Sequence, residues 1–279
     1  MVHIITDSTA CVPASTLKEF AGQLHVVPLK IILGERSVDE PTMTARSVFD
    51  YVKQTKSFPT TSQPAPGEFI EVFERIVSAG DTAVCVTLSS SVSGTYGNAV
   101  RGAEMVGKGK IFVVDSRSSS GGQWHFVQQA LVLAGQGVSA ADIHAQLTVL
   151  SKRNHIYILV DTLEYLHKGG RIGAASSFFG SILGIRPVLH ADNGVIEVLD
   201  KARTQKRAMA RIVEQMQTLG SLKWVGISHS ICPEYAELMK NIIREKFADV
   251  PIEISQNGAT IGVHFGPGTL AVFAECAQV

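Results

Sequence analysis

Residues 83–100, AVCVTLSSSVSGTYGNAV, carry a dense row of hydroxyl side chains around one glycine, Gly94. The apolar residues at the start of this stretch are typical of a buried strand, and the small polar residues after them are typical of a turn into a helix. The hydroxyl groups are therefore expected at the carboxyl end of a strand, which is the edge where open α/β sheets bind ligands. The row comprises Thr87, Ser89, Ser90, Ser91, Ser93 and Thr95.

Further polar segments lie near other predicted strands and helices: TDST at residues 6–9, PTTSQPAPGEF at 59–69 and DSRSSSGG at 115–122. Taken singly, each is explained by helix capping, because Asp, Ser and Thr are preferred at helix N-termini. In a parallel sheet, however, the strand exits meet at one edge. The hydroxyl groups gathered there exceed what capping needs, and a ligand site is predicted.

The ligand predicted for this edge is a small anion, since helix N-termini and hydroxyl donors favour negative charge. Residues 87–100 contain no Lys or Arg, and the chain has no GxxxxGK[ST] motif, so a carboxylate fits better than a nucleotide triphosphate. The alternative is a nucleophilic serine. No GxSxG motif supports that alternative.

A second candidate lies near the carboxyl end, where HFGPG places His264 before a Gly-Pro-Gly turn. The sequence predicts that His264 ends an apolar strand of a second domain. A single histidine is often only a hydrogen-bonded structural residue. If the two domains face each other across the strand exits, His264 can instead donate to an anion held by the first domain.

The elements that would position these residues alternate between strands and helices. Short β-branched runs are typical of buried parallel strands: VHIIT, HVVPLKIIL, AVCVTL, IFVVD and IYILV. Amphipathic helices are predicted between them, one around Phe69 and Phe73 and another after a Ser139 N-cap. This pattern predicts an N-terminal parallel α/β/α sandwich over residues 1–160.

The remaining residues, 161–279, are predicted to form a smaller mixed-sheet α/β domain. Asn193-Gly194 between two apolar runs predicts a tight hairpin. A helix around Met209, a strand WVGIS, a helix from Pro233 and the terminal strands VPIEIS, TIGVHF and LAVFAE complete it. Hairpins combined with crossovers imply a mixed sheet, and the ligand is expected between the two domains.

Composition excludes several classes of function. Lys+Arg and Asp+Glu both number 25, so the charge footprint of a nucleic-acid-binding protein is absent. No apolar run is long enough to span a bilayer and no signal peptide is recognisable, so we expect a cytoplasmic protein without stable membrane insertion. The cysteines are far apart and form no CxxC motif, which predicts neither a metal site nor a disulfide framework. We expect no cofactor.

Six motifs together resemble the DegV family, and the similarity covers nearly the whole chain. They are TSQP (61–64), SSSVSGTYGNA (89–99), VVDS (113–116), KGGRIG (168–173), KARTQKRA (201–208) and HFGPG (264–268). The resemblance implies a carrier, not an enzyme, that holds one long-chain fatty acid between two α/β domains. It also implies a partner: a separate ATP-binding kinase subunit that phosphorylates the bound carboxylate.

Residue by residue, the resemblance implies that Thr61, Ser93 and His264 bind the carboxylate. The Gly94 N–H is a further candidate, because glycine lets the chain approach a ligand closely. Ser62 and Thr95 are alternatives to their neighbours. Ala65 stands where relatives commonly carry a serine, which removes one donor beside the site.

Other positions have two readings. Arg171 and Arg203 are candidates for contact with the kinase subunit, although a structural role would explain either of them. The apolar residues 172–185 could line an acyl tunnel or form a core helix, with Phe178, Phe179, Ile182 and Leu183 as tunnel candidates. The alternative function is a serine-dependent acyl hydrolase or transferase, with Ser93 as nucleophile and His264 as base.

Overall fold

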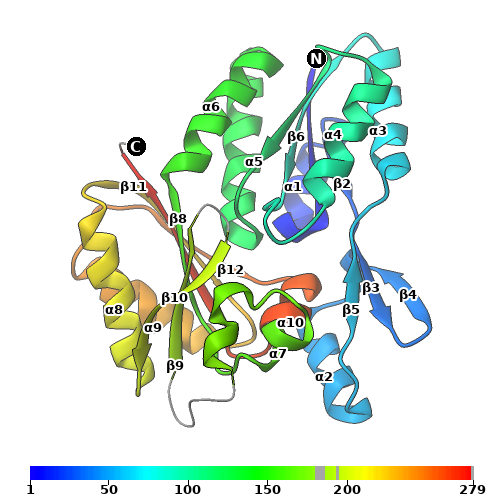
Figure 1. The fold of residues 1–279 in the computed structure, drawn as a ribbon. Coiled ribbons are helices and arrows are strands. Elements are labelled where there is room, and N and C mark those ends of the chain that lie inside the picture. The colour runs from blue at the N-terminus through cyan, green and yellow to red at the C-terminus, as the bar shows by residue number, and fades with distance from the viewer. Residues whose placement is uncertain (180–185, 193–194, 278–279) are drawn as a thin grey trace.

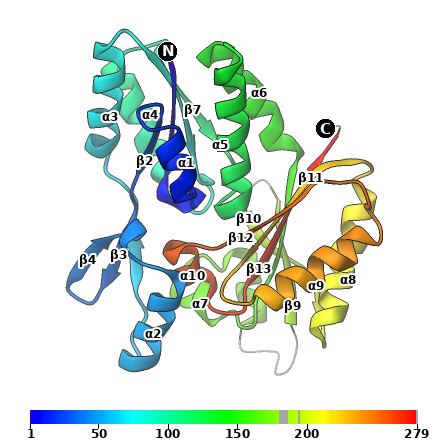
Figure 2. The same cartoon turned by 180° about the vertical axis from the view of Figure 1, so that it is seen from behind.

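The computed structural model describes residues 1–179, 186–192 and 195–277. Two sheets with their helices dominate it, one in the upper and one in the lower part of Figures 1 and 2. The upper sheet has four parallel strands in the order β2-β1-β6-β7. Its strands are β1 (Val2–Asp7), β2 (Leu24–Val27), β6 (Thr82–Thr87) and β7 (Ile111–Asp115).

Helices cover both faces of this sheet because successive residues of its strands point to opposite sides. Ile4 and Val84 pack with α5 and α6, whereas the adjacent Ile5 and Cys85 pack with α3 and α4. The predicted parallel α/β/α sandwich is therefore confirmed. The helices are α1 (Ala14–Glu19), α3 (Pro66–Ser78), α4 (Thr95–Val106), α5 (Ser120–Gly135) and α6 (Ala140–Arg153), and the 3-10 turn η1 (Ser8–Ala10) follows β1.

The run HVVPLKIIL is two strands, not the single parallel strand predicted. It divides at Pro28, which has no N–H to donate to a sheet. The second half leaves the parallel sheet and forms a small antiparallel sheet in the order β4-β3-β5, next to α2. These elements are β3 (Lys30–Leu33), β4 (Arg36–Asp39), η2 (Glu40–Thr42), α2 (Ala45–Thr55) and β5 (Thr60–Ser62).

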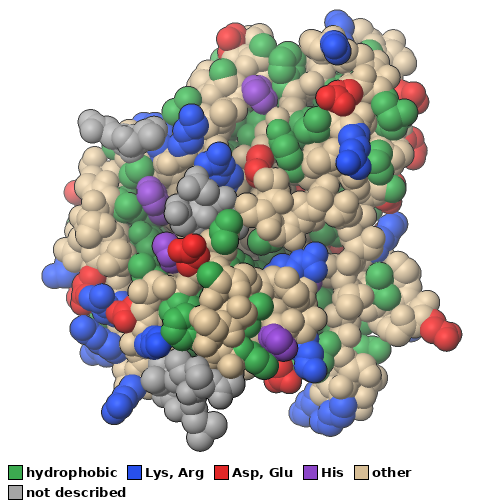
Figure 3. Space-filling model, in the orientation of Figure 1, with side chains coloured by type: hydrophobic (Ala, Val, Ile, Leu, Met, Phe, Trp, Pro, Cys, Tyr) green, Lys and Arg blue, Asp and Glu red, His purple; other side chains and the backbone are tan. Residues whose placement is uncertain are grey.

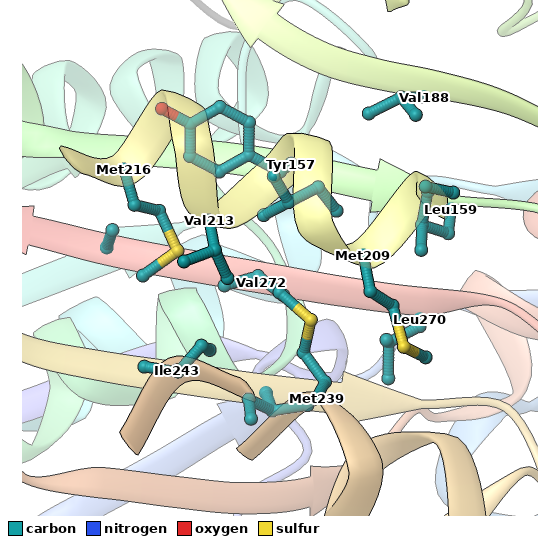
Figure 4. Packing of buried hydrophobic residues seen from close by; sticks show 14 of the residues in the cluster. Tyr157, Leu159, Val188, Met209, Val213, Met216, Met239, Ile243, Leu270 and Val272 are labelled. Atoms are coloured by element: carbon teal, nitrogen blue, oxygen red, sulfur yellow. The ribbon is translucent and has the colours of Figure 1, made fainter. Parts of the chain in front are cut away.

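The lower sheet is mixed, as predicted, with six strands in the order β10-β9-β8-β13-β11-β12. Helices α8 (Gln205–Thr218) and α9 (Pro233–Arg244) pack on one face, where Figure 4 shows Met209, Val213 and Met239 against the strands. The strands are β8 (Asn154–Leu159), β9 (Arg186–Asp192), β10 (Val195–Ala202), β11 (Leu222–His229), β12 (Ile252–Gln256) and β13 (Leu270–Cys276).

Strand β8 corrects one prediction. The run IYILV was assigned to the first, parallel sheet, but β8 pairs antiparallel with β9 and β13 in the lower sheet. The lower sheet thus begins at Asn154, ahead of the domain boundary predicted after residue 160. A strand buried on both faces has the same apolar run in either kind of sheet, so the run itself could not distinguish them.

Helix α10 (Ala259–Phe265) corrects another prediction, since TIGVHF was expected to be a strand. In this segment the apolar residues Ile261, Val263 and Phe265 alternate with small or polar ones, which is the pattern of a strand, and the tertiary contacts of the segment override that pattern. Helix α10 packs against α2 and α7 (Glu164–Lys168), and the 3-10 turn η3 (Gly173–Phe178) lies beside β10. The Asn193-Gly194 hairpin lies outside the described residues, although β9 and β10 pair antiparallel on either side of it.

Candidate functional site

A cavity of about 300 Å³ lies between the two sheets. Its floor is the face of the lower sheet that α8 and α9 leave uncovered: Ile156 and Ile158 of β8 point into the cavity, whereas Tyr157 and Leu159 point to the helices. In Figure 3, hydrophobic side chains are visible in the middle of this face of the molecule, between its upper and lower parts. The other apolar wall residues are Leu29, Leu88, Val92, Ala191, Ile196, Ile261 and Phe265.

Predicted carboxylate ligands meet in the wall of this cavity. Thr61 comes from β5, Ser93 from the loop between β6 and α4, and His264 from α10. Thr61 Oγ1 and His264 Nε2 are hydrogen-bonded at 2.8 Å, although 203 positions separate them in the chain. Ser62 also lines the cavity. The prediction that His264 ends a strand is wrong, but its helix still carries it to the cavity.

Ser93 and Thr95 differ in their access to the cavity. Their hydroxyl groups are hydrogen-bonded to each other at 2.9 Å. Ser93 lines the cavity, whereas Thr95 is fully buried and is not among the residues described as lining it. Thr95 therefore orients the Ser93 hydroxyl from behind.

Gln63 is a site residue that the sequence analysis missed. Its Oε1 accepts a hydrogen bond of 2.9 Å from the Gly94 N–H, so the protein already satisfies the donor that was predicted to bind the ligand. A Cβ atom on Gly94 would lie 2.5 Å from Gln63 Oε1. Gly94 is thus needed for the close approach of Gln63. An uncharged amide directly after Thr61 and Ser62, at the end of β5, was the available signal.

His264 is neutral at physiological pH. Burial and, to a smaller extent, the positive charge of Arg171 together lower its pKa from 6.5 to about 4. The Nδ1 atom is buried and has no hydrogen-bond partner among the described residues. A Cβ atom on Gly169 would lie 2.3 Å from Nδ1, so Gly169 holds the imidazole ring by close packing.

Arg171 is half-buried and lines the cavity, and its contact with a kinase subunit stays a prediction. Its guanidinium is fixed by backbone carbonyls, donating from Nε to Val92 O at 3.2 Å and from Nη1 to Gly169 O at 2.8 Å. This geometry places the positive charge of Arg171 near His264, in the wall of the same cavity. Arg203, in contrast, is exposed directly after β10 and is not among the residues described as lining the cavity.

Two of the tunnel candidates, Phe178 and Phe179, are not among the residues described as lining this cavity. The Lys201 ammonium group lies over the Phe178 ring, 4.2 Å from the ring centroid. Phe179 stacks on His167 with 4.0 Å between the ring centroids, and it is 41% exposed. Ile182 and Leu183 lie outside the described residues. The apolar wall comes mainly from β8, β9, β10 and α10 instead. Sequence reasoning missed it because it placed β8 in the other sheet and took α10 for a strand.

The remaining polar segments divide between the cavity wall and the scaffold. Arg117, Ser118 and Ser119, after β7, line the cavity. Asp7, in TDST, instead accepts hydrogen bonds from the N–H groups of Thr9 at 3.0 Å and Leu88 at 2.7 Å, and burial raises its pKa. The capping explanation therefore holds for TDST.

Two features bear on other classes of site. No group of His, Cys, Asp or Glu among the described residues could hold a metal ion. Within the same part of the chain, no helix has the length and hydrophobicity that crossing a bilayer requires.

Comparison with known proteins extends over nearly the whole chain. A family model described as an uncharacterised protein of the DegV family matches residues 1–276. A DegV domain-containing protein of Halalkalibacterium halodurans is 35% identical over 277 residues, covering 97% of each chain. A crystal structure of DegV from Bacillus subtilis, described as a fatty acid binding protein, is 32% identical with a TM-score of 0.85, covering 98% of this chain and 99% of its own. A Thermus thermophilus DegV family structure, described by its fatty acid binding, is 28% identical with a TM-score of 0.90, covering 99% of both chains.

Proposed function

The chain belongs to the DegV family, and we propose that it is a fatty-acid-binding protein whose ligand lies in the cavity between the two sheets. The related structures from Bacillus subtilis and Thermus thermophilus are described as binding fatty acid. The observation that carries the proposal is the hydrogen-bonded pair of Thr61 and His264, together with Ser93, in the wall of an otherwise largely apolar cavity.

The polar group of the wall suits a carboxylate. Neutral His264 can donate from Nε2 to Thr61 Oγ1, which leaves the hydroxyl proton of Thr61 for the ligand, and the Ser93 hydroxyl is a second donor. Arg171 adds a fixed positive charge that offsets the cost of burying the anion. Gly94 shapes this end of the site through its contact with Gln63, Thr95 orients the Ser93 hydroxyl, and Ser62 is a further hydroxyl in the wall.

The apolar part of the wall suits an acyl chain. A pocket of about 300 Å³ falls at the small end of the range for bound organic ligands. A smaller cavity of about 20 Å³ shares Ile156, Ile158 and Phe265 with it and reaches Phe273. Burying about fourteen methylenes would contribute on the order of 11 kcal/mol before the costs of binding. Each charge-assisted hydrogen bond adds about 1.5 to 3 kcal/mol, so the chain supplies most of the affinity and the polar group selects the head.

The geometry argues against Ser93 and His264 as a hydrolytic pair. The Ser93 hydroxyl bonds to Thr95, and His264 Nε2 bonds to Thr61. The low pKa of His264 makes it a weak general base at neutral pH. Its Nδ1 has no orienting partner among the described residues, unlike the histidine of a catalytic triad.

The proposal includes a partner, namely a separate ATP-dependent kinase subunit that converts the bound carboxylate to an acyl phosphate. Arg203 is its contact residue: it is exposed between the end of β10 and the start of α8, away from the cavity wall. Arg203→Glu is expected to reduce acyl phosphate formation by the kinase subunit with ATP, measured as acyl hydroxamate. Its fatty acid affinity would stay at the wild-type value. Loss of binding, or unchanged phosphorylation, would reject this role.

Native mass spectrometry of the purified protein tests the binding proposal. We expect a noncovalent adduct of fatty acid mass that is lost on denaturation and recovered in an organic extract. Thr61→Ala should lower the occupancy, whereas Thr60→Ala, which changes the exposed neighbour in the same strand, should not. A protein that stays empty when offered fatty acids would refute the proposal. A covalent acyl adduct on Ser93 would favour the hydrolase or transferase instead.

A further inference from the structure

Glu40 is a buried carboxylate outside the cavity wall, in the turn η2 between β4 and α2. Glu40 is only 3% exposed. Its carboxylate takes part in none of the ion pairs formed among the described residues. Burial raises its pKa, while hydrogen bonds from Ser8 and Thr260 act in the opposite direction. An isolated buried acid is costly, so its position needs a reason.

The two carboxylate oxygens of Glu40 join segments that lie far apart in the chain. Ser8 Oγ, just after β1 of the upper sheet, donates to Oε2 at 2.5 Å. The backbone N–H of Thr260, in the first turn of α10, donates to Oε1 at 2.8 Å. Ser8 Oγ also accepts from the N–H of Leu29, a cavity-wall residue, at 2.9 Å. Glu40 therefore ties α10 to the exit of strand β1.

Helix α10 depends on such a tie. It has only seven residues, and isolated helices of this length are unstable in water. Its N-cap residue, Gly258, offers no side chain for capping, and a Cβ atom there would lie 2.9 Å from Glu40 Oε1. Glu40 thus takes the place of a local cap. The same helix presents Ile261, His264 and Phe265 to the cavity.

We propose that Glu40 is a positioning residue that holds α10 so that His264 faces Thr61, and that it thereby sets the preference of the cavity for a carboxylate head group. This inference rests on the proposed binding of fatty acids. Glu40 acts through its hydrogen bonds and does not touch the ligand, because it is not among the residues that line the described cavity.

The test compares palmitic acid with 1-hexadecanol, which has the same chain length and no carboxylate. The ratio of the two dissociation constants isolates the head group. Glu40→Ala should lower the acid preference by about tenfold, a typical effect of misplacing one hydrogen bond to a charged group, with alcohol affinity within twofold of wild type. Glu40→Gln should keep the preference within about threefold, because its amide oxygen can still accept from Thr260 N–H. Glu35→Ala, in the exposed β3–β4 turn, is the matched control and should behave as wild type.

A double variant shows whether Glu40 works through His264. In the His264→Ala background, Glu40→Ala should change the acid preference no further. If Glu40→Ala does not fold, Ser8→Ala provides the same test, because it removes one of the two tethers and should lower the preference in the same direction by about threefold. An unchanged preference in these variants, a parallel loss of alcohol affinity, or equal losses in Glu40→Ala and Glu40→Gln would overturn the inference. A wild-type protein that does not prefer the acid would instead refute the carboxylate site itself.

Discussion

We expect His264 to make the stability of the lipid-free protein depend on pH, and His264→Gln to remove that dependence. Burial and Arg171 hold the pKa of His264 at about 4 in the folded protein, against an ordinary value of 6.5. Between these values the unfolded chain binds a proton that the folded chain does not. The folded state is therefore favoured fully above pH 6.5, and this advantage is lost as the pH falls toward 4.

The size of the effect follows from the difference between 6.5 and about 4. At about 1.4 kcal/mol per pH unit, the full loss is about 3 kcal/mol, of which about 2 kcal/mol has gone by pH 5. His264 is only 7% exposed, so solvent screening reduces this value little. A loss of this size is a substantial part of the stability of a typical domain.

Urea unfolding of both proteins at pH 7 and pH 5 measures the effect. The stability of wild type relative to His264→Gln should fall by about 2 kcal/mol between these conditions. Asp7 and Glu40, whose pKa values are raised by burial, respond to pH with the opposite sign, but they do so in both proteins and cancel in the difference. The difference in unfolding free energy between wild type and His264→Gln could instead stay constant, or shift in favour of wild type at pH 5. Either result would show that His264 is not held neutral by burial.

Three further changes probe the site. Gly94→Ala should break the hydrogen bond from the Gly94 N–H to Gln63, since the added Cβ would lie 2.5 Å from the Gln63 amide oxygen. It should lower fatty acid affinity about tenfold with little change in melting temperature. Unchanged affinity would contradict the role given to Gln63. Ile158→Trp should fill part of the cavity and abolish the co-purification of fatty acid that mass spectrometry measures. Circular dichroism should still show a folded protein. Retention of the fatty acid would place the ligand elsewhere. Arg171→Met should weaken palmitic acid binding about tenfold without affecting 1-hexadecanol binding. It should also raise the pKa of His264 in an NMR titration. Equal losses of affinity for the acid and the alcohol would indicate that Arg171 has only a packing role.

Motifs at strand ends were readable from the sequence because their chemistry is local. The hydroxyl row around Ser93 follows a β-branched run, and any parallel sheet exposes such residues at its carboxyl edge. Thr61 and His264 were linked to Ser93 by the family resemblance, and the structure brings all three to one cavity. The alternation of strands and helices likewise predicted the α/β/α sandwich and the mixed second sheet.

The tertiary structure alone decided which surfaces enclose the cavity. The apolar part of β8 does not distinguish a parallel strand from an antiparallel one, and the alternating apolar and polar residues of α10 favour a strand although the segment forms a short helix. Their assignment depends on the partners that bury them: β9 and β13 for β8, and α2, α7 and Glu40 for α10. The apolar wall of the cavity, the placement of Arg171 beside His264 and the contact of Gln63 with Gly94 all follow from those long-range contacts. Local residue pattern determined the chemistry of the site, whereas packing between segments far apart in the chain determined its shape.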